Sequence, residues 1–238
     1  MDIQYQGQRV LDRQGENCGM IDQVQQLLPA LAGGSRILLL MSGGVESSTL
    51  LRLLQRAGHA PEPFFLDYAQ RAATQEWRSV LAQCGQLGIA ARRIPMGELG
   101  EALGELRPHR FHVPVLYRNL IAISVAASAA GALGIPHICI GITADDAAVD
   151  SGSRAETLAP LRNSLAALGR TLLLPLSELT KAEVVALGQD LGVEWNLSYS
   201  CLLGRAQHCG VCPQCLKRRE AFRRAGLRSV DVQYARNE

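Results

Sequence analysis

The sequence predicts an α/β fold with a doubly wound, mostly parallel sheet, and three observations support this class. Continuous apolar runs alternate with segments of helical spacing from Arg36 onward, as expected for strands that are buried on both faces. Glycine or proline closes most of these segments. The first apolar run leads directly into Ser42-Gly43-Gly44, and in such sheets ligands lie beyond the carboxyl ends of the strands.

The expected elements follow one another in a regular order. Strands are predicted at residues 36–41, 63–67, 91–94, 137–142 and 171–174. Helices are predicted at residues 47–57, 72–87, 119–133, 155–168 and 180–191, the last of them opening with the capping box of Thr180 and Glu183. Residues 21–31 also have helical spacing, but no chemistry can be assigned to them.

Length and composition favour one substantial domain with smaller additions. The chain has 238 residues, of which 47% are hydrophobic and 19% charged, as in ordinary globular proteins. We predict an N-terminal extension at residues 1–35, an α/β domain at residues 36–195 and a C-terminal module at residues 196–238.

Charge and hydropathy argue against two classes of partner, nucleic acid and the membrane. The net charge of +2 gives no case for tight nucleic-acid binding, so nucleic acid is not the expected partner. Residues 119–144 contain no Asp, Glu, Lys or Arg, but Gly134 and Pro136 interrupt this stretch. We therefore interpret this stretch as a buried helix and strand, not a membrane span. The N-terminus has no signal-peptide pattern, and a soluble, cytoplasmic protein is expected.

The loop after the first strand is a candidate phosphate site. Gly43 and Gly44 have no Cβ, so the backbone can turn tightly, and the following helix can aim free N–H groups at an anion. Ser42, Ser47 and Ser48 add hydroxyl donors, although Ser47 and Ser48 could instead be plain helix caps. The loop is not a Walker loop, because no Gly-Lys-Ser/Thr follows.

Four of the seven cysteines form a candidate metal site. Cys201, Cys209, Cys212 and Cys215 lie within fifteen residues, and two-residue gaps allow thiolates to converge on one tetrahedral Zn²⁺. Four protein ligands would leave no position for a reacting water, so the metal would be structural. The alternatives are free or redox-active thiols, an iron–sulfur cluster, and a nucleic-acid-binding ribbon. The basic residues of 217–224 keep the last alternative open, although they could be a solvated helix face.

Several motifs together carry a family resemblance. Ser42 to Ser47 resembles the pyrophosphatase loop Ser-Gly-Gly-x-Asp-Ser, with Glu46 in place of Asp. Asp67-Tyr68-Ala69-Gln70-Arg71 resembles Asp-Tyr-Gly-Gln-Arg, and Val113-Pro114 with Arg118-Asn119 resembles Val-Pro-Gly-Arg-Asn with two extra residues between the halves. The remaining matching segments are Leu179-Thr180-Lys181-Ala182-Glu183 and Ser200-Cys201 through Cys215 to Phe222. From about Arg36 to Gly226 the chain resembles the 7-cyano-7-deazaguanine synthases of queuosine biosynthesis, whose fold is that of adenine nucleotide α-hydrolases.

The resemblance implies an ATP-dependent carbon–nitrogen ligase. Members of the family adenylate 7-carboxy-7-deazaguanine, release pyrophosphate, and use ammonia and a second ATP to form the amide and then the nitrile. The implied cofactors are ATP, Mg²⁺ and Zn²⁺, and the implied partners are the small carboxylate and ammonia, in a homodimer. A protein acceptor is an alternative partner.

The resemblance also assigns roles to individual residues. The catalytic residues would be Ser42, Ser47 and Lys181. The ATP-binding residues would be Met41, Ser42, Gly43, Gly44, Glu46, Ser47, Ser48 and Asp67. The substrate-binding residues would be Arg118, Asn119, Asp146 and Arg154. Lys181 could instead be a surface lysine, while Asp67 and Asn119 could be turn and helix caps.

One segment departs from the family pattern. The family motif Gly-x-Asn-Ala-Glu-Asp-Tyr-Ser-Gly-Tyr-Pro-Asp-Cys-Arg corresponds to residues 141–154, where Gly141, Ala144, Asp146 and Arg154 are kept. The two tyrosines of the motif are replaced by Ala147 and Asp150, and its aspartate before Cys-Arg is replaced by Gly152. Two alternatives therefore stand beside the synthase. They are a related adenylating ligase with another carboxylate or acceptor, such as one that joins a deazapurine to a protein in antiviral defence, and a nucleotide-binding zinc protein that acts on RNA.

Overall fold

The computed structural model of the chain describes residue 28 and residues 31–106 and 115–236. Its centre is a sheet of five parallel strands in the order β3-β2-β1-β4-β5. The strands are β1 (Arg36–Leu40), β2 (Ala60–Asp67), β3 (Arg92–Pro95), β4 (His137–Ile140) and β5 (Thr171–Leu173). The predicted α/β class with a parallel sheet is therefore confirmed.

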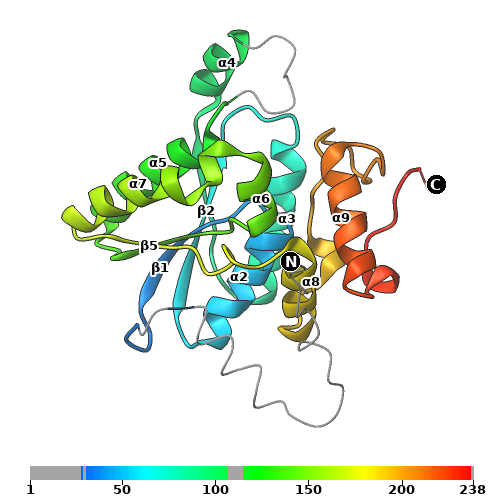
Figure 1. The fold of residues 1–238 in the computed structure, drawn as a ribbon, viewed down its shortest axis with the longest axis horizontal. Helices are drawn as coiled ribbons and strands as arrows, with labels where there is room; N and C mark the ends of the chain where they lie inside the picture. Colours follow the sequence, from blue (N-terminus) through cyan, green and yellow to red (C-terminus); the bar gives the residue numbers. More distant parts are fainter. Residues whose placement is uncertain (1–27, 29–30, 107–114, 237–238) are drawn as a thin grey trace, which may run out of the picture.

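Helices follow the strands along the chain (Figure 1). The α-helices are α2 (Val45–Arg56), α3 (Ala73–Gln86), α4 (Gly97–Glu105), α5 (Arg118–Leu133), α6 (Ala144–Val149), α7 (Ala155–Ala167), α8 (Lys181–Asp190) and α9 (Pro213–Arg224). Three short 3-10 helices are η1 (Ser151–Ser153), η2 (Trp195–Leu197) and η3 (Arg228–Val230). All five predicted strands and all five predicted helices are present, with ends that differ by no more than three residues.

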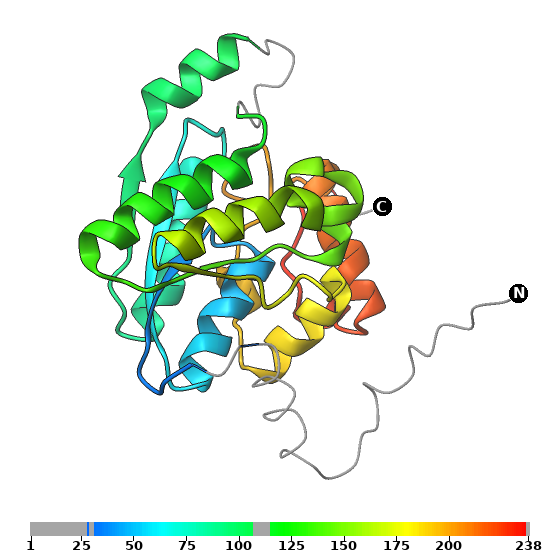
Figure 2. The same ribbon diagram turned by 60° about the vertical axis from the view of Figure 1, so that its left-hand side comes forward.

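Two hydrophobic layers hold the helices to the sheet. Side chains alternate between the faces of a strand, so Ile37 and Leu39 of β1 face one layer while Leu38 and Leu40 face the other. The first layer packs against α2, α3, α8 and α9, and the second against α5 and α7. Figure 2 shows α5 and α7 side by side on one side of the sheet. The sheet is therefore covered on both faces, as its uninterrupted apolar strands require.

Strand β2 begins three residues before its predicted start, at Ala60, despite two prolines. Pro61 and Pro63 pair with β1, but β3 reaches only the second half of β2, from Phe64 onward. One edge of the first half is therefore without a strand neighbour, and a missing N–H costs little on such an edge. Tertiary pairing, which local sequence does not show, explains the longer strand.

The N-terminal prediction lies almost wholly outside the described residues. Of the helical stretch predicted at residues 21–31, only Leu28 and Leu31 are described, and both belong to the layer under α2. The division into units at residues 1–35, 36–195 and 196–238 stays a prediction. Within the described ranges, no helix is long and apolar enough to cross a membrane.

The strand order fixes where a ligand can bind. The chain runs outward from β1 through β2 to β3, and then returns to β4 on the other side of β1. In such sheets a crevice opens at the carboxyl ends of the strands where the order reverses. Here that point lies between β1 and β4, where the Ser-Gly-Gly loop begins.

Candidate active site

The loop between β1 and α2 is pressed against α3. Gly43 has a left-handed φ of 76°, and a Cβ at this position would lie 2.7 Å from Ser79 Oγ and 2.9 Å from the Glu76 carbonyl oxygen. Gly44 is the N-cap residue of α2, and as a glycine it has no side chain that could accept a hydrogen bond from the first N–H groups of the helix. The first N–H groups of α2 are therefore not satisfied by a cap, and a helix start of this kind can bind an anion.

Three serine hydroxyls lie at the loop and at the start of α2, and they make different contacts. Ser42 Oγ and Ser47 Oγ lie 3.4 Å apart and line the cavity described below. Ser47 Oγ donates to the Gly44 carbonyl at 3.3 Å, and Ser48 Oγ donates to the same carbonyl at 2.5 Å. The hydroxyl of Ser48 therefore bonds back to the preceding turn of its own helix and does not act as the helix cap that the sequence left open.

An ion pair joins the loop to the start of α8. Lys181 Nζ lies 2.5 Å from Glu46 Oε1, and their side chains are only 12% and 16% exposed. Burial acts to raise the pKa of Glu46, but the charge and hydrogen bond of Lys181 outweigh it and hold the pKa below its usual value. The backbone N–H of Lys181 donates to Asp145 Oδ2 at 2.8 Å. Lys181 is therefore an anchored cation beside the loop.

A cavity of about 470 Å³ opens beside the loop, where β1, β2 and β4 end. The predicted site residues that line it are Met41, Ser42, Gly44, Glu46, Ser47, Arg118, Asn119, Asp146 and Lys181. The predicted residues not among its lining are Gly43, Ser48, Asp67 and Arg154. Residues far apart in the sequence are thus gathered around one space.

Asp67 and Arg154 have contacts elsewhere. Asp67 Oδ2 pairs with the guanidinium of Arg93, and its Oδ1 accepts the Ala69 N–H at 3.2 Å. This is the turn-capping arrangement that the sequence offered as the alternative for Asp67. Arg154 is exposed, and its Nε donates to the Ala147 carbonyl at 3.3 Å.

Sequence reasoning missed a carboxylate on α3. Glu76 lines the cavity, and burial raises its pKa although Gln70 Nε2 donates to its Oε2 at 2.8 Å. Burial also raises the pKa of the neighbouring Tyr68 to about 12. Tyr68 and Gln70 belong to the matched motif after β2, so that motif could have pointed to them. No local signal marks Glu76, whose position depends on the packing of α3 against the loop.

The opposite wall is built by α5, α6 and η1. Asn119 Nδ2 donates to Ser153 Oγ at 2.8 Å, and Ser153 Oγ donates to Asp150 Oδ2 at 3.0 Å. Asp146 forms a capping box with Thr143 at the start of α6. Asp150, Ser153 and Tyr117 also line the cavity, and the sequence did not mark them as site residues.

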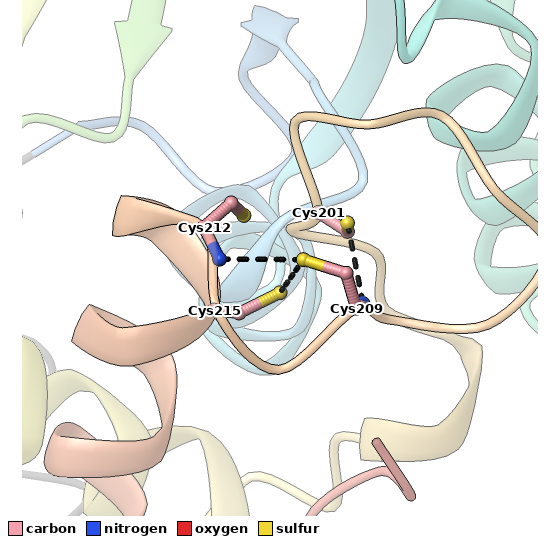
Figure 3. Close-up of side chains that lie close together, drawn as sticks. All are labelled: Cys201, Cys209, Cys212 and Cys215. Atoms are coloured by element: carbon pink, nitrogen blue, oxygen red, sulfur yellow. Dashed lines mark hydrogen bonds between the residues drawn. The ribbon is translucent and has the colours of Figure 1, made fainter. Parts of the chain in front are cut away.

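The four clustered cysteines converge as predicted (Figure 3). Their sulfur atoms all lie within 4.8 Å of one another, and all four residues are buried. The backbone N–H of Cys212 lies 3.3 Å from Cys209 Sγ, and the N–H of Cys209 lies 3.4 Å from Cys201 Sγ. Thiolates that accept such bonds at this spacing can hold one metal ion, as in a structural four-thiolate site.

The segment before the cysteines contacts the Ser-Gly-Gly loop directly. The Tyr199 N–H donates to the Gly43 carbonyl at 2.9 Å. Ser79 Oγ lies 2.9 Å from the same carbonyl and 2.5 Å from the Leu197 carbonyl. The loop is therefore held between α3 and the chain that leads into the cysteine cluster.

His208 and Arg218 stabilise this region from within. His208 Nε2 accepts the Ser200 N–H at 3.0 Å, and burial lowers the pKa of His208 to about 4, so the ring is neutral. Arg218 is fully buried and pairs with Asp231 at 2.6 Å. It also donates to Ser198 Oγ at 2.8 Å.

The basic face of α9 is largely occupied by contacts within the chain. Arg218 is the buried cation described above, and Arg219 lies over the Tyr234 ring at 5.3 Å. Arg223 and Arg224 both pair with Glu220. These contacts weaken the case for an RNA-binding helix, since phosphate contacts need free cations.

Solved structures and curated relatives agree with this architecture. The U34-tRNA thiolase NcsA from Methanococcus maripaludis, solved with its [4Fe-4S] cluster, superposes with a TM-score of 0.58 and 15% identity, covering 85% of this chain and 69% of that one. The NMN synthetase from Francisella tularensis gives a TM-score of 0.51 and 16% identity, covering 91% of this chain and 96% of its own. At these identities the likeness shows the fold.

The sequence relatives are more specific. The 7-cyano-7-deazaguanine synthase 1 of Sulfurisphaera tokodaii is 34% identical over 195 residues, which cover 81% of this chain and 95% of that protein. The 7-cyano-7-deazaguanine synthase of Paramagnetospirillum magneticum is 31% identical over 222 residues, covering 80% and 95%. The model of the family described as queuosine biosynthesis protein QueC matches residues 36–226. The chain therefore belongs to the QueC family, whose enzymes are the 7-cyano-7-deazaguanine synthases and their relatives.

Proposed function

We propose that this protein is an ATP-dependent ligase that adenylates 7-carboxy-7-deazaguanine, or a close relative of it, and converts the product with ammonia into 7-cyano-7-deazaguanine. The observation that carries the proposal is that a Ser-Gly-Gly loop at a helix start, a lysine anchored by an ion pair and an arginine with no ion-pair partner among the described residues line one cavity. Ser42, Ser47, Lys181 and Arg118 contribute these groups. Family membership supports the same reaction.

The loop suits the departure of pyrophosphate. When the substrate carboxylate attacks the α-phosphorus, a new C–O–P bond forms, the bond to the β-phosphate oxygen breaks, and negative charge grows on the leaving pyrophosphate. Donors from the start of α2 and from Ser42 and Ser47 would meet that charge. Lys181 would add a cation, and its pairing with Glu46 keeps it in place before ATP arrives.

The walls of the cavity suit the acid. Arg118 can pair with the substrate carboxylate and orient it toward the α-phosphate, while Asn119 is fixed by Ser153. Ammonia would then attack the carbonyl carbon of the acyl-adenylate, lose a proton, and expel AMP. A second ATP would activate the amide oxygen on the way to the nitrile.

The side chains present fit the two implied metals. Glu46 and Asp146 offer carboxylate oxygens at the cavity, the ligand type that Mg²⁺ takes alongside phosphate oxygens. Cys201, Cys209, Cys212 and Cys215 would hold Zn²⁺ in a closed site. Mg²⁺ would neutralise phosphate charge, and Zn²⁺ would have a structural role.

The proposal is tested by pyrophosphate release from ATP with a set of carboxylates, with and without ammonia. We expect release to depend on 7-carboxy-7-deazaguanine and to yield amide or nitrile only with ammonia. Release that depends on another acid alone would assign the chain to a related adenylating ligase. Failure to release pyrophosphate from ATP with any of the acids would contradict the ligase assignment.

A serine substitution ties the reaction to the loop. We expect Ser47→Ala to lower the rate of pyrophosphate release by about 10²-fold, the usual effect of removing one donor to developing charge. Ser124→Ala is the matched control, because Ser124 Oγ makes a similar bond to the Leu120 carbonyl within α5. Unchanged kinetics in Ser47→Ala would remove this hydroxyl from the mechanism.

A further inference from the structure

Tyr117 stands at the edge of the cavity in a conformation that a bulky residue rarely adopts. Its φ is 51° and its ψ is 36°, which is the left-handed region, and it is the N-cap of α5. A non-glycine residue in this region costs about 1–2 kcal/mol. The side chain is half exposed and lines the cavity. Strain of this kind persists where the structure around it requires it, and often at a ligand site.

Gly152 packs beside the Tyr117 ring. A Cβ at position 152 would lie 3.4 Å from Tyr117 Cδ1 and 3.4 Å from Asp150 Oδ1. Gly152 is buried and does not have a left-handed φ, so its backbone conformation does not demand glycine. The aromatic ring and the carboxylate therefore lie on the same glycine, and both line the cavity.

Asp150 is a hydrogen-bond acceptor at the cavity, and two hydrogen bonds hold its carboxylate in place. Its Oδ1 accepts the Gly152 N–H and its Oδ2 accepts Ser153 Oγ, each at 3.0 Å. Ser153 is in turn held by Asn119. Asp150 pairs with no cation among the described residues, and each carboxylate oxygen can accept a further bond.

The three residues depart from the family pattern together. The pattern has tyrosine at the position of Asp150 and aspartate at the position of Gly152, and Tyr117 lies in a segment with two residues more than the pattern. An aromatic ring and a carboxylate are thus both present in this corner, but they come from different backbone positions. Because Tyr117 and Asp150 both lie within 4 Å of a Cβ at position 152, these departures alter one subsite.

We propose that Tyr117 and Asp150 form the subsite for the heterocycle of the substrate. The Tyr117 ring would stack on a planar bicyclic base, and Asp150 would accept its adjacent N–H groups, those of a 2-aminopyrimidinone edge. The carboxylate of the substrate would then point toward Arg118. Arg118 lies close enough to Glu76 for its positive charge to act on the pKa of Glu76, and Glu76 borders the Ser-Gly-Gly loop. The inference rests on the proposed function, because it takes the acid to be a deazapurine.

The test is equilibrium binding of 7-carboxy-7-deazaguanine to the full chain by calorimetry. We expect Tyr117→Leu to weaken binding by about tenfold or more, as loss of one stacking partner does. Tyr117→Phe should stay within about twofold, because the ring is kept. Leu81→Ala, a side chain of similar exposure outside the cavity, is the control and should bind as the unmodified chain does.

A second ligand tests the carboxylate. The unmodified chain should bind the guanine-type acid about tenfold more tightly than a 7-deazaadenine acid that lacks the paired donors. Asp150→Asn should abolish that preference while ATP affinity and thermal unfolding stay unchanged. The asparagine Oδ1 can still accept the Gly152 N–H and its Nδ2 can donate to Ser153 Oγ in place of the bond that Ser153 donates to Asp150, so η1 should persist.

The outcomes separate this inference from the ligase proposal. Failure of the unmodified chain to bind the deazaguanine acid, or equal binding by Tyr117→Leu, would overturn the subsite whether or not pyrophosphate is released. Loss of ATP affinity in Tyr117→Leu with acid affinity unchanged would assign the ring to adenine and also overturn it. Weakened acid binding in both variants without any pyrophosphate release would support the subsite and contradict the ligase.

Discussion

At the scale of single residues, the described part of the chain keeps glycine-like backbone at two positions without glycine. Ala69 and Tyr117 have φ values of 60° and 51°. Ala69 stands where the resemblance places the glycine of Asp-Tyr-Gly-Gln-Arg, and Tyr117 directly precedes Arg118 in the segment that resembles Val-Pro-Gly-Arg-Asn with two extra residues. Ala69 follows Tyr68, which lines the cavity, and Tyr117 lines the cavity itself. The backbone beside the cavity is therefore held in this conformation at some cost in strain.

The strain at Ala69 predicts a stabilising substitution. Ala69→Gly should raise the free energy of unfolding by about 1 kcal/mol, because glycine adopts a positive φ without the Cβ penalty. Urea unfolding at neutral pH measures this. The matched control is Ala73→Gly in the first turn of α3, where the same change should lower stability instead. A loss of stability in Ala69→Gly would show that the backbone there is not strained.

The buried pair of Glu46 and Lys181 predicts a pH-dependent stability. The folded pKa of Glu46 lies below its unfolded value of about 4.5, so the unfolded chain binds more protons in that window. The pair therefore stabilises the fold above about pH 4.5, and this contribution is lost as the pH falls through the lowered pKa. We expect Lys181→Met to cost about 2 kcal/mol at pH 7, since one buried charge is left without a partner, and less at pH 4.

A surface pair provides the comparison for this measurement. Arg36 and Glu62 form an ion pair at 2.6 Å, but their side chains are 48% and 31% exposed. Arg36→Met should cost less than about 1 kcal/mol at either pH, because solvent screens the exposed pair. Equal costs for Lys181→Met at pH 4 and pH 7 would contradict the assignment of a buried charged pair.

At the scale of elements, local sequence predicts most of the scaffold and part of the site. The strands and longer helices have strong apolar patterns and clear stop signals, so they were predictable. Helix α4 was not, because Gly97, Gly100 and Gly104 argue against a helix. The reason for Gly100 is tertiary, since a Cβ there would lie 1.8 Å from the Tyr68 carbonyl oxygen.

The same limit applies to the site. Residues in the loop after the first predicted strand and in the first turn of the next helix, such as Ser42 and Ser47, could be assigned to the cavity from sequence. Glu76, Tyr117 and Asp150 could not, because they reach the cavity through the packing of α3, α5 and η1. Residue type alone also could not separate Asp67, which caps a turn and pairs with Arg93, from a ligand-binding carboxylate.

The Ser-Gly-Gly loop allows a prediction that compares its two glycines, Gly43 and Gly44. Gly43→Ala should abolish measurable pyrophosphate release and lower stability by about 2 kcal/mol, because the φ is positive and a Cβ would meet Ser79 Oγ at 2.7 Å. Gly44→Ala is the milder partner, since its Cβ would lie 3.3 Å from Ser42 Oγ. Activity and thermal unfolding of both variants measure the difference. Equal effects of the two changes would contradict the described loop geometry.

The cysteine cluster gives a second prediction at this scale. Cys212→Ser should lose the bound zinc and lower the melting temperature, and should weaken ATP turnover because Tyr199 links this region to Gly43. Metal analysis and thermal unfolding measure this. Cys84→Ser applies the same change to a buried thiol outside the cluster and should keep one zinc per chain. An unmodified chain without zinc would discard the four-thiolate site.

At the scale of the whole molecule, one cavity unites the sheet, its two helical layers and the C-terminal region. The switch point between β1 and β4 places the loop, and α5 and α6 supply the opposite wall. Tyr199, Ser200 and Lys217 close the cavity from the side of the cysteine cluster. The cysteine cluster therefore adjoins one wall of the cavity, and a metal ion held by its four thiolates would stabilise that wall.

The most direct measurement of the central claim follows the oxygen atoms of the acid. The account requires that a carboxylate oxygen of the substrate attacks the α-phosphorus, so that this oxygen leaves with AMP when ammonia forms the amide. The experiment uses 7-carboxy-7-deazaguanine labelled with oxygen-18 in its carboxylate, with ATP and ammonia, and reads the products by mass spectrometry. The account predicts one labelled oxygen in AMP and none in pyrophosphate. Label in inorganic phosphate together with ADP, or no label transfer at all, would contradict it.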